Sequence, residues 1–259
     1  MRIIVIIFFL FFSQILNGQE VLSSLISNPF LNGKKHILVE SKSSIGLPFF
    51  DDFSYNSAVV NIDLWEKSSV FVNRNYPINP VSIGVATFDG LDAYGFARNF
   101  SQANPSAPSD TLLSHKIDFS VIDTAYLMFY FQGKGIGDAP EFDDFLVLEF
   151  LNDYLIWEQI WFSHGQSMQE FKKVIQIIDE PKFLHSSFQF RFRNYATISG
   201  NFDHWHIDYI KLDEFLNPND TIILNDVTFV YSAPSFLNRY EQMPWTHFKN
   251  NELAEMNDT

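Results

Sequence analysis

Two tryptophans and two arginines are residues whose types and spacing suit ligand binding. Trp157 and Trp161 lie four positions apart with Gln159 between them, so an extended backbone would present all three on one face. Arg191 and Arg193 alternate with phenylalanines in a second run. Indole rings stack on sugar rings, and amide or guanidinium groups hydrogen-bond to hydroxyls. These five side chains are predicted to bind a surface glycan or protein partner; the alternative is that the tryptophans belong to the core.

A glycine-rich acidic segment, residues 133–144, is a second place where chemistry could occur. Its glycines give the backbone unusual freedom, and its acidic residues are Asp138, Glu141, Asp143 and Asp144. These carboxylates could form a cation site or a ligand-facing loop. Their spacing does not match an EF-hand, and no Gly-Lys-Ser/Thr phosphate loop is present. The simpler prediction is a solvated hairpin loop.

Two histidines and an aspartate, His204, His206 and Asp208, alternate along one run and would share one face of a strand. Imidazole nitrogens and a carboxylate are zinc ligands. Neighbouring residues offer no evident third or fourth ligand, so the alternative is ordinary polar residues on a strand.

Candidates for catalysis are weak. Glu149 and Glu158 could act as the paired carboxylates of a glycosidase, but they stand in separate runs. The chain has no Gly-x-Ser-x-Gly elbow, and its zero cysteines exclude thiol chemistry. We therefore expect no catalytic residues and no enzymatic activity.

We expect β-strands rather than helices to position these residues. Short apolar runs rich in aromatic residues alternate with Gly, Pro, Asn and Asp clusters, a pattern typical of an all-β sandwich. The predicted strands are 49–54, 65–73, 83–88, 111–119, 125–132, 145–151, 155–163, 171–178, 188–194, 205–212 and 221–231.

Two of these runs predict geometry directly. Residues 188–193 alternate strictly, so Phe188, Phe190 and Phe192 must face one side and Arg191 and Arg193 the other. Residues 125–131 are apolar on both sides, which predicts a central strand.

Composition limits the partners. The chain carries a formal net charge of −14 and 17% aromatic residues, without a Lys/Arg-rich run. Such an acidic surface repels phosphate backbones, so nucleic acid is not an expected partner.

The N-terminus predicts export. Arg2 precedes the apolar run 3–12, and a small residue, Gly18, follows, as in a secretory signal peptide. We expect a signal peptide at 1–19, a linker at 20–46, a β-sandwich at 47–232 and a polar extension at 233–259. No transmembrane segment is expected after cleavage. Together with the absence of cysteine, this predicts a secreted or surface protein exported through the periplasm of a Gram-negative bacterium.

Six segments resemble, in order, the MAM and choice-of-anchor jelly rolls of Bacteroidota surface proteins. They are residues 47–53, 84–91, 110–114, 144–149, 188–194 and 205–209. The resemblance implies a concanavalin-like jelly-roll β-sandwich of two antiparallel sheets on an exported, often adhesive protein. It also implies that Trp205, Ile207 and Tyr209 face the core, with the alternating polar residues outside.

The resemblance further suggests a structural cation. In related jelly rolls the first and last strands are neighbours, which would bring Asp51 and Asp52 towards Asp208, with Asp203 close by. Converging carboxylates suit Ca²⁺, which takes six to eight oxygen ligands. The alternative is that these aspartates accept hydrogen bonds from N–H groups of nearby turns.

Three functions remain open at this point. The first is a non-catalytic module for adhesion or glycan binding, the second a structural module of a multidomain surface protein, and the third a glycan hydrolase. An exposed aromatic platform would favour the first, and a flat apolar patch the second. A cleft with two carboxylates about 5–9 Å apart would be required for the third.

Overall fold

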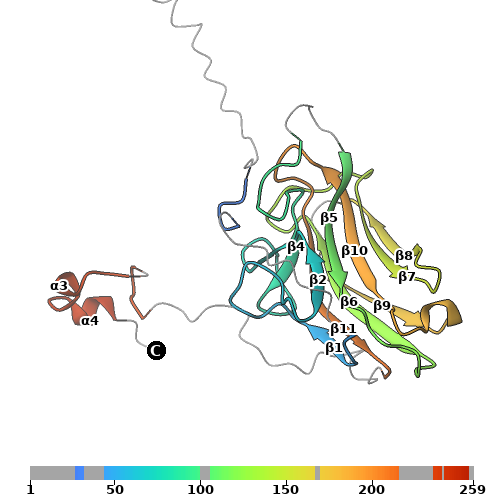
Figure 1. Cartoon of the computed structure of the whole chain (residues 1–259). Helices are drawn as coiled ribbons and strands as arrows, with labels where there is room; N and C mark the ends of the chain where they lie inside the picture. Colours follow the sequence, from blue (N-terminus) through green and yellow to red (C-terminus); the bar gives the residue numbers. More distant parts are fainter. Residues whose placement is uncertain are drawn as a thin grey trace, which may run out of the picture.

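The computed structural model describes residues 27–31, 44–99, 106–166, 170–215, 236–240 and 242–256. Within these residues, eleven strands form two antiparallel sheets packed face to face, so the predicted jelly-roll β-sandwich is confirmed (Figure 1). The predicted signal peptide at 1–19 and the predicted strand at 221–231 lie outside the described residues.

The six-stranded sheet has β11 at its centre. Its order is β3-β4-β11-β6-β9, and β1 pairs with β11 beyond the end of β4. Its strands are β1 (Phe49–Asp51), β3 (Phe71–Asn73), β4 (Val85–Phe88), β6 (Ala125–Gly133), β9 (Lys172–Ile178) and β11 (Trp205–Asp213). The first and last strands are therefore neighbours, as the resemblance implied.

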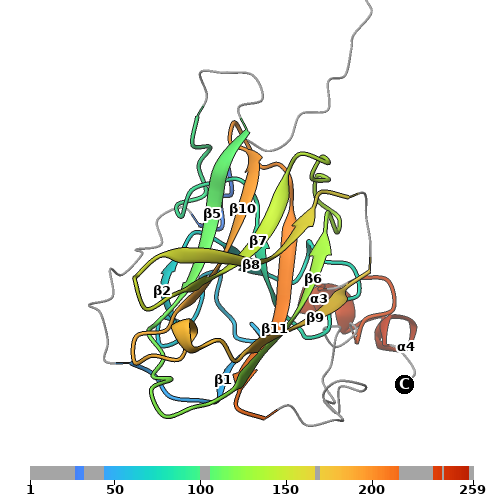
Figure 2. The ribbon, with the colours of Figure 1, turned by 90° about the vertical axis from the view of Figure 1, so that its right-hand side faces the viewer.

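The five-stranded sheet has the order β2-β5-β10-β7-β8 (Figure 2). Its strands are β2 (Trp65–Ser68), β5 (Ser106–Ser114), β7 (Phe145–Leu151), β8 (Trp157–His164) and β10 (Phe190–Thr197). A 3-10 turn, η1 (Pro181–Phe183), lies between β9 and β10. The chain passes repeatedly from one sheet to the other, which is why segments distant in sequence become neighbours.

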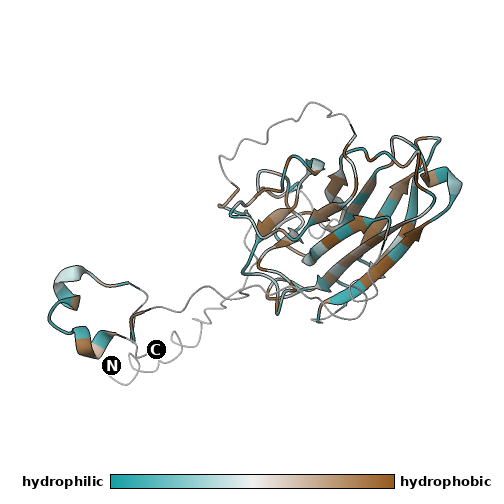
Figure 3. Cartoon of the chain, turned by 90° about the horizontal axis from the view of Figure 1, so that it is seen from below, coloured by the Kyte–Doolittle hydropathy of each residue, from teal (hydrophilic) through white to brown (hydrophobic). Residues whose placement is uncertain are grey.

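The core lies between the sheets and is strongly aromatic. Phe188, Phe190 and Phe192 are 0% exposed, which confirms the alternation expected for their run. Phe190 packs edge-on against Phe49 and Trp65, which come from one strand of each sheet. The strands of the sandwich alternate between hydrophobic and hydrophilic residues in Figure 3. Burying apolar area at about 25 cal/mol per Å² makes this core the main source of stability.

One predicted strand, residues 65–73, is in fact two. β2 belongs to the five-stranded sheet and β3 to the six-stranded sheet, so the chain changes sheets at Ser69 and Val70. At this crossing the side-chain oxygen of Ser69 accepts a hydrogen bond from the Thr111 N–H at 3.0 Å. A continuous apolar run does not reveal such a crossing, because both halves are buried against the same core.

A β-bulge in β11 changes which residues face the core. Asp208 pairs with Tyr130 and Lys211 with Met128, so β11 holds one extra residue between these two pairs. Ile210 is 0% exposed, whereas Tyr209 packs against Phe50, which is exposed on the outside. The expectation that Tyr209 faces the core is therefore wrong, while Trp205 and Ile207 face it as expected.

The described part of the C-terminal extension contains two short helices, α3 (Trp245–Phe248) and α4 (Glu252–Glu255). Leu237 and Met256 form an isolated antiparallel bridge there. Among the residues that the structure describes, no helix has the length and apolar character needed to cross a membrane.

Candidate functional site

The outward surface of the five-stranded sheet, called the outer face below, collects most of the predicted ligand-binding residues. Cross-strand pairing aligns Lys67, Leu113, Arg191, Glu149 and Gln159 in one row across all five strands. A second row contains Thr111, Arg193, Val147 and Phe162. Residues paired across strands share a face, so these side chains form one surface.

Glu149 holds both arginines of this face. Arg193 donates to it twice, from Nε at 2.7 Å and from Nη2 at 2.6 Å, and Arg191 donates from Nε at 2.5 Å. The Glu149 side chain is 10% exposed and the arginines 21% and 24%. Paired carboxylate and guanidinium groups of this geometry are fixed in orientation.

Electrostatics agree with this geometry. Burial raises the pKa of Glu149, but the hydrogen bonds and charges of Arg193 and Arg191 outweigh burial, so its pKa lies below the ordinary 4.5. The carboxylate is therefore ionised at neutral pH. Two arginines against one glutamate leave a net positive charge on this part of a chain whose formal net charge is −14.

Trp157 lies on the outer face, but its role differs from the prediction. The Arg191 guanidinium lies over its ring, 4.0 Å from the ring centre. The indole thus supports the guanidinium, a cation–π contact of about 0.5–2 kcal/mol. Gln159, which was expected between the two tryptophans, is exposed on the same face.

Trp161 does not share the face of Trp157, so that prediction is wrong. Leu148 pairs with Trp161 and Glu149 with Gln159, which leaves Ile160 as an extra residue in β8. This bulge turns Trp161 inward, where it packs edge-on against Phe129 and Phe131. The interpretation that at least one tryptophan belongs to the core is confirmed for Trp161.

Further aromatic residues on the outer face were not predicted. Phe162 is 48% exposed and contacts His164 edge-on. Phe142 stacks on His164, with 4.7 Å between the ring centroids. Phe145 stacks on Tyr195 at 4.2 Å, in the next cross-strand row. The signal that could have found Phe162 and His164 is the alternation of β8, once the bulge is taken into account.

The aspartates predicted to bind calcium do not meet in one place. Asp51 accepts hydrogen bonds from Trp65 Nε1 at 2.7 Å and from the Phe53 N–H at 2.9 Å. Asp208 accepts from the Ser82 N–H at 2.8 Å and the Ser82 hydroxyl at 2.6 Å. Asp52 accepts from the Ser54 N–H. These carboxylates bind neutral donors of the protein, which was the alternative prediction.

Asp203 lies in a different cluster. Its carboxyl group meets Glu141 and Asp144, with one oxygen of each residue within 4.8 Å of the others. In the described part of the chain, groups of three or more possible metal ligands at this spacing do not include Asp51, Asp52 or Asp208. Glu141 and Asp144 of the acidic loop therefore lie beside Asp203, which was predicted to bind calcium. Asp138 and Asp143 are exposed and lie outside this cluster.

The predicted zinc ligands are buried, and all of their side-chain polar atoms except Nε2 of His204 have hydrogen-bond partners among the described residues. His206 Nδ1 lies 2.8 Å from the Thr87 hydroxyl and its Nε2 lies 3.2 Å from the Lys134 carbonyl. His204 Nδ1 accepts the Asp138 N–H at 3.0 Å. Burial lowers the pKa of His204 to about 4 and that of His206 to about 3. Both are neutral, and the expectation that the polar side of β11 lies outside is wrong because loops cover it.

The two glutamates considered for glycoside hydrolysis face opposite sides of the sheet. Glu149 pairs across the sheet with outward-facing Arg191, whereas Glu158 pairs with Phe150, which is 0% exposed. Glu158 binds Lys182 at 2.7 Å instead. Two carboxylates in this arrangement cannot flank one glycosidic bond.

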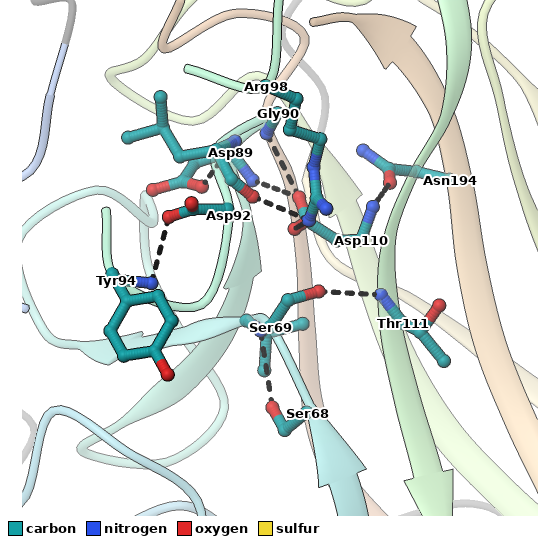
Figure 4. Close-up of polar contacts among 12 residues, drawn as sticks. Ser68, Ser69, Asp89, Gly90, Asp92, Tyr94, Arg98, Asp110, Thr111 and Asn194 are labelled. Atoms are coloured by element: carbon teal, nitrogen blue, oxygen red, sulfur yellow. Dashed lines mark hydrogen bonds and ion pairs between the residues drawn. The ribbon is translucent and has the colours of Figure 1, made fainter. Parts of the chain in front are cut away.

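A buried aspartate joins three strands elsewhere. Asp110 accepts the N–H groups of Asp89 and Gly90 at 2.9 Å each, and Arg98 Nη2 at 3.0 Å (Figure 4). Its own N–H donates to the side chain of Asn194 at 2.7 Å. Both carboxylate oxygens of Asp110 have partners, so this group links the turn after β4 to β5 and β10 and leaves no free carboxylate oxygen for a ligand.

A cleft of about 410 Å³ lies beside β3 and is lined by Phe30, Tyr55, Phe71, Tyr76 and other residues. Its buried Asn73 donates to the Thr87 hydroxyl and accepts two backbone N–H groups. Because this polar side chain is already bonded within the protein, the outer face is the better candidate for a ligand site.

No model of a known protein family matches this chain, and no curated protein sequence matches it. Among similar solved structures, an arabinose-bound α-L-arabinofuranosidase has 12% identity and a TM-score of 0.35, covering 58% of this chain and 22% of its own. A family 16 carbohydrate-binding module has 10% identity and a TM-score of 0.34, covering 57% and 89%. The K1 cleaved adhesin domain of Lys-gingipain from Porphyromonas gingivalis W83 has 10% identity and a TM-score of 0.35, covering 65% and 98%. Similarity at this level assigns no function.

Proposed function

We propose that this chain is an exported, non-catalytic binding module that recognises a saccharide on the outer face. The observation that carries the proposal is the fixed group formed by Trp157, Arg191, Glu149 and Arg193. Its guanidinium groups are held before any ligand arrives, so binding would cost little side-chain entropy.

The chemistry of this face favours a saccharide that carries carboxylate or sulfate groups. The exposed parts of Arg191 and Arg193 present planar donors, which match the geometry of oxyanions. Phe162, two strands away in β8, adds an exposed aromatic surface on which the apolar face of a sugar ring can pack.

Binding of soluble polysaccharides, measured by affinity electrophoresis and calorimetry, tests this function. Acidic polysaccharides should bind and neutral ones should bind less. Arg193→Ala should weaken binding at least tenfold and Phe162→Ala several-fold, while circular dichroism and the melting temperature show folded protein. Binding should also fall as salt rises, because screening weakens the contribution of the arginines. Folded wild-type protein that binds no polysaccharide of an acidic and neutral panel contradicts the proposal.

A second candidate function is docking to another protein through the β7–β8 hairpin. Three consecutive residues at its tip, Tyr154, Leu155 and Ile156, are 79%, 69% and 59% exposed. Asn152 holds this tip by accepting the Tyr154 and Ile156 N–H groups. Leu155→Asn separates the two functions: it should leave saccharide binding unchanged, and Asn tolerates the φ of 60° found there. A loss of saccharide binding in this variant would move the site to the hairpin.

A further inference from the structure

Three carboxyl groups from two loops meet at one end of the sandwich. Glu141 and Asp144 precede β7, and Asp203 precedes β11. Trp205, at the start of β11, pairs with Gly133 at the end of β6, so the two loops run side by side. The His204 N–H donates to the Asp138 carbonyl and joins the loops directly.

Asp203 has an oxygen that nothing in the described structure satisfies. Its side chain is 1% exposed, and one oxygen, Oδ2, accepts the Thr197 N–H at 2.6 Å. The other, Oδ1, is buried without a hydrogen-bond partner among the described residues. A buried carboxylate oxygen without a donor is costly, so Oδ1 is available to a ligand, and the Glu141 carboxyl lies beside Asp203.

The charges around Asp203 point the same way. The pKa of Asp203 is raised to about 8, mainly by burial and also by the carboxyls of Asp144 and Glu141. The hydrogen bond from the Thr197 N–H lowers this pKa but does not outweigh them. Burial likewise raises the pKa of Asp144 to about 7. No positive charge is among these influences. The close approach of these carboxyl groups and the unpaired Oδ1 of Asp203, rather than their titration, indicate a cation site.

We propose that Glu141, Asp144 and Asp203 bind one Ca²⁺ that links the two loops. The possible ligand atoms, all oxygens within 4.8 Å of one another, suit a hard cation, and loop carbonyls and water would complete a shell of six to eight oxygens. The same loop carries Phe142, which stacks on His164 at the end of the outer face. The ion would thus hold an aromatic residue in place there, although its binding does not depend on any saccharide.

Calorimetric titration of the chelator-treated full chain with CaCl₂ tests the site. One Ca²⁺ should bind per chain, and a Ca²⁺ concentration about 100-fold above Kd should raise the melting temperature by roughly 5–10 °C. Asp203→Asn should abolish both effects, and it keeps the shape of the side chain at a φ of 55°. Asp143→Asn is the matched control: it removes one charge from the same loop, outside the cluster, and should bind one Ca²⁺.

Glu141→Gln provides a second variant, because Glu141 is exposed and its substitution should not prevent folding even if Asp203→Asn does. It should weaken Ca²⁺ binding at least tenfold. A wild-type chain that shows neither binding heat nor a change in melting temperature overturns the proposal, and the carboxyls then share protons. Unchanged binding in folded Glu141→Gln and Asp203→Asn also overturns it.

Discussion

At the residue scale, Glu149 decides how the outer face presents its charge. It is the common acceptor of Arg191 and Arg193, and without it the two guanidinium groups would repel each other across neighbouring positions of one strand face. The same residue could have been read as half of a catalytic pair. Its three hydrogen bonds from arginine show what it does in the structure: it fixes the positions of the two guanidinium groups.

Glu149→Gln should lower the free energy of unfolding by about 1–3 kcal/mol at pH 7, because charge-assisted bonds are lost from a largely buried group. Since the folded pKa of Glu149 lies below 4.5, its contribution is present above pH 4.5 and is lost as the pH falls through the folded pKa. Urea unfolding at pH 7 and at pH 3 measures both effects.

The control for this prediction is Glu158→Gln. Glu158 pairs with Lys182 at the surface, where solvent screens the interaction, so its loss should lower the free energy of unfolding much less than the loss of Glu149. Equal effects of the two substitutions at pH 7 would contradict the special role of Glu149.

At the element scale, two β-bulges decide which side chains face the ligand and which face the core. The extra residue in β8 separates Trp157 from Trp161, and the extra residue in β11 turns Tyr209 outward. Side chains alternate along a regular strand, so one inserted residue reverses the face of everything beyond it.

Trp161→Ala should destabilise the fold by about 3 kcal/mol, because the indole packs between the sheets against Phe129 and Phe131. Trp157→Ala should cost about 1 kcal/mol, since its ring supports Arg191 on the surface. Thermal and urea unfolding of the two variants compare these values. If the two substitutions lower the free energy of unfolding equally, the bulge in β8 does not place one tryptophan in the core and the other on the surface.

At the scale of the whole molecule, the two sheets have different outward surfaces. The five-stranded sheet is open, with the charged group of Glu149 upon it. The six-stranded sheet is covered by the loops around Tyr76, Ser82 and Lys134, so that His204, His206 and Asp208 are 2%, 0% and 0% exposed. Among the described residues, the polar side of β11 is therefore covered, whereas Gln159 and Phe162 on the outer face are exposed.

This cover makes the sandwich sensitive to acid. The pKa of His206 is lowered from 6.5 to about 3, so the unfolded chain binds the proton more readily than the folded one. Stability due to this neutral histidine is present above about pH 6.5 and is lost as the pH falls towards 3. Buried carboxyls with raised pKa values, such as Asp203 and Asp144, act in the opposite direction over the same range, so the prediction is a difference between two proteins. Between pH 7 and pH 5 the melting temperature of His206→Gln should fall less, or rise more, than that of the wild type. An identical change in the variant would show that His206 does not contribute to the pH dependence.

The sequence by itself determined the fold class and the inward phenylalanines of β10, because hydrophobic alternation is a local property that survives in any sandwich. It also placed Arg191, Arg193 and Gln159 on an outward face. Which residues share a site was decided only by the tertiary structure. Bulges reversed Trp161 and Tyr209, and loop packing brought Asp203 to Glu141 and Asp144 rather than to Asp208. Strand pairing and loop contacts join residues far apart in the chain, and no local pattern encodes their register.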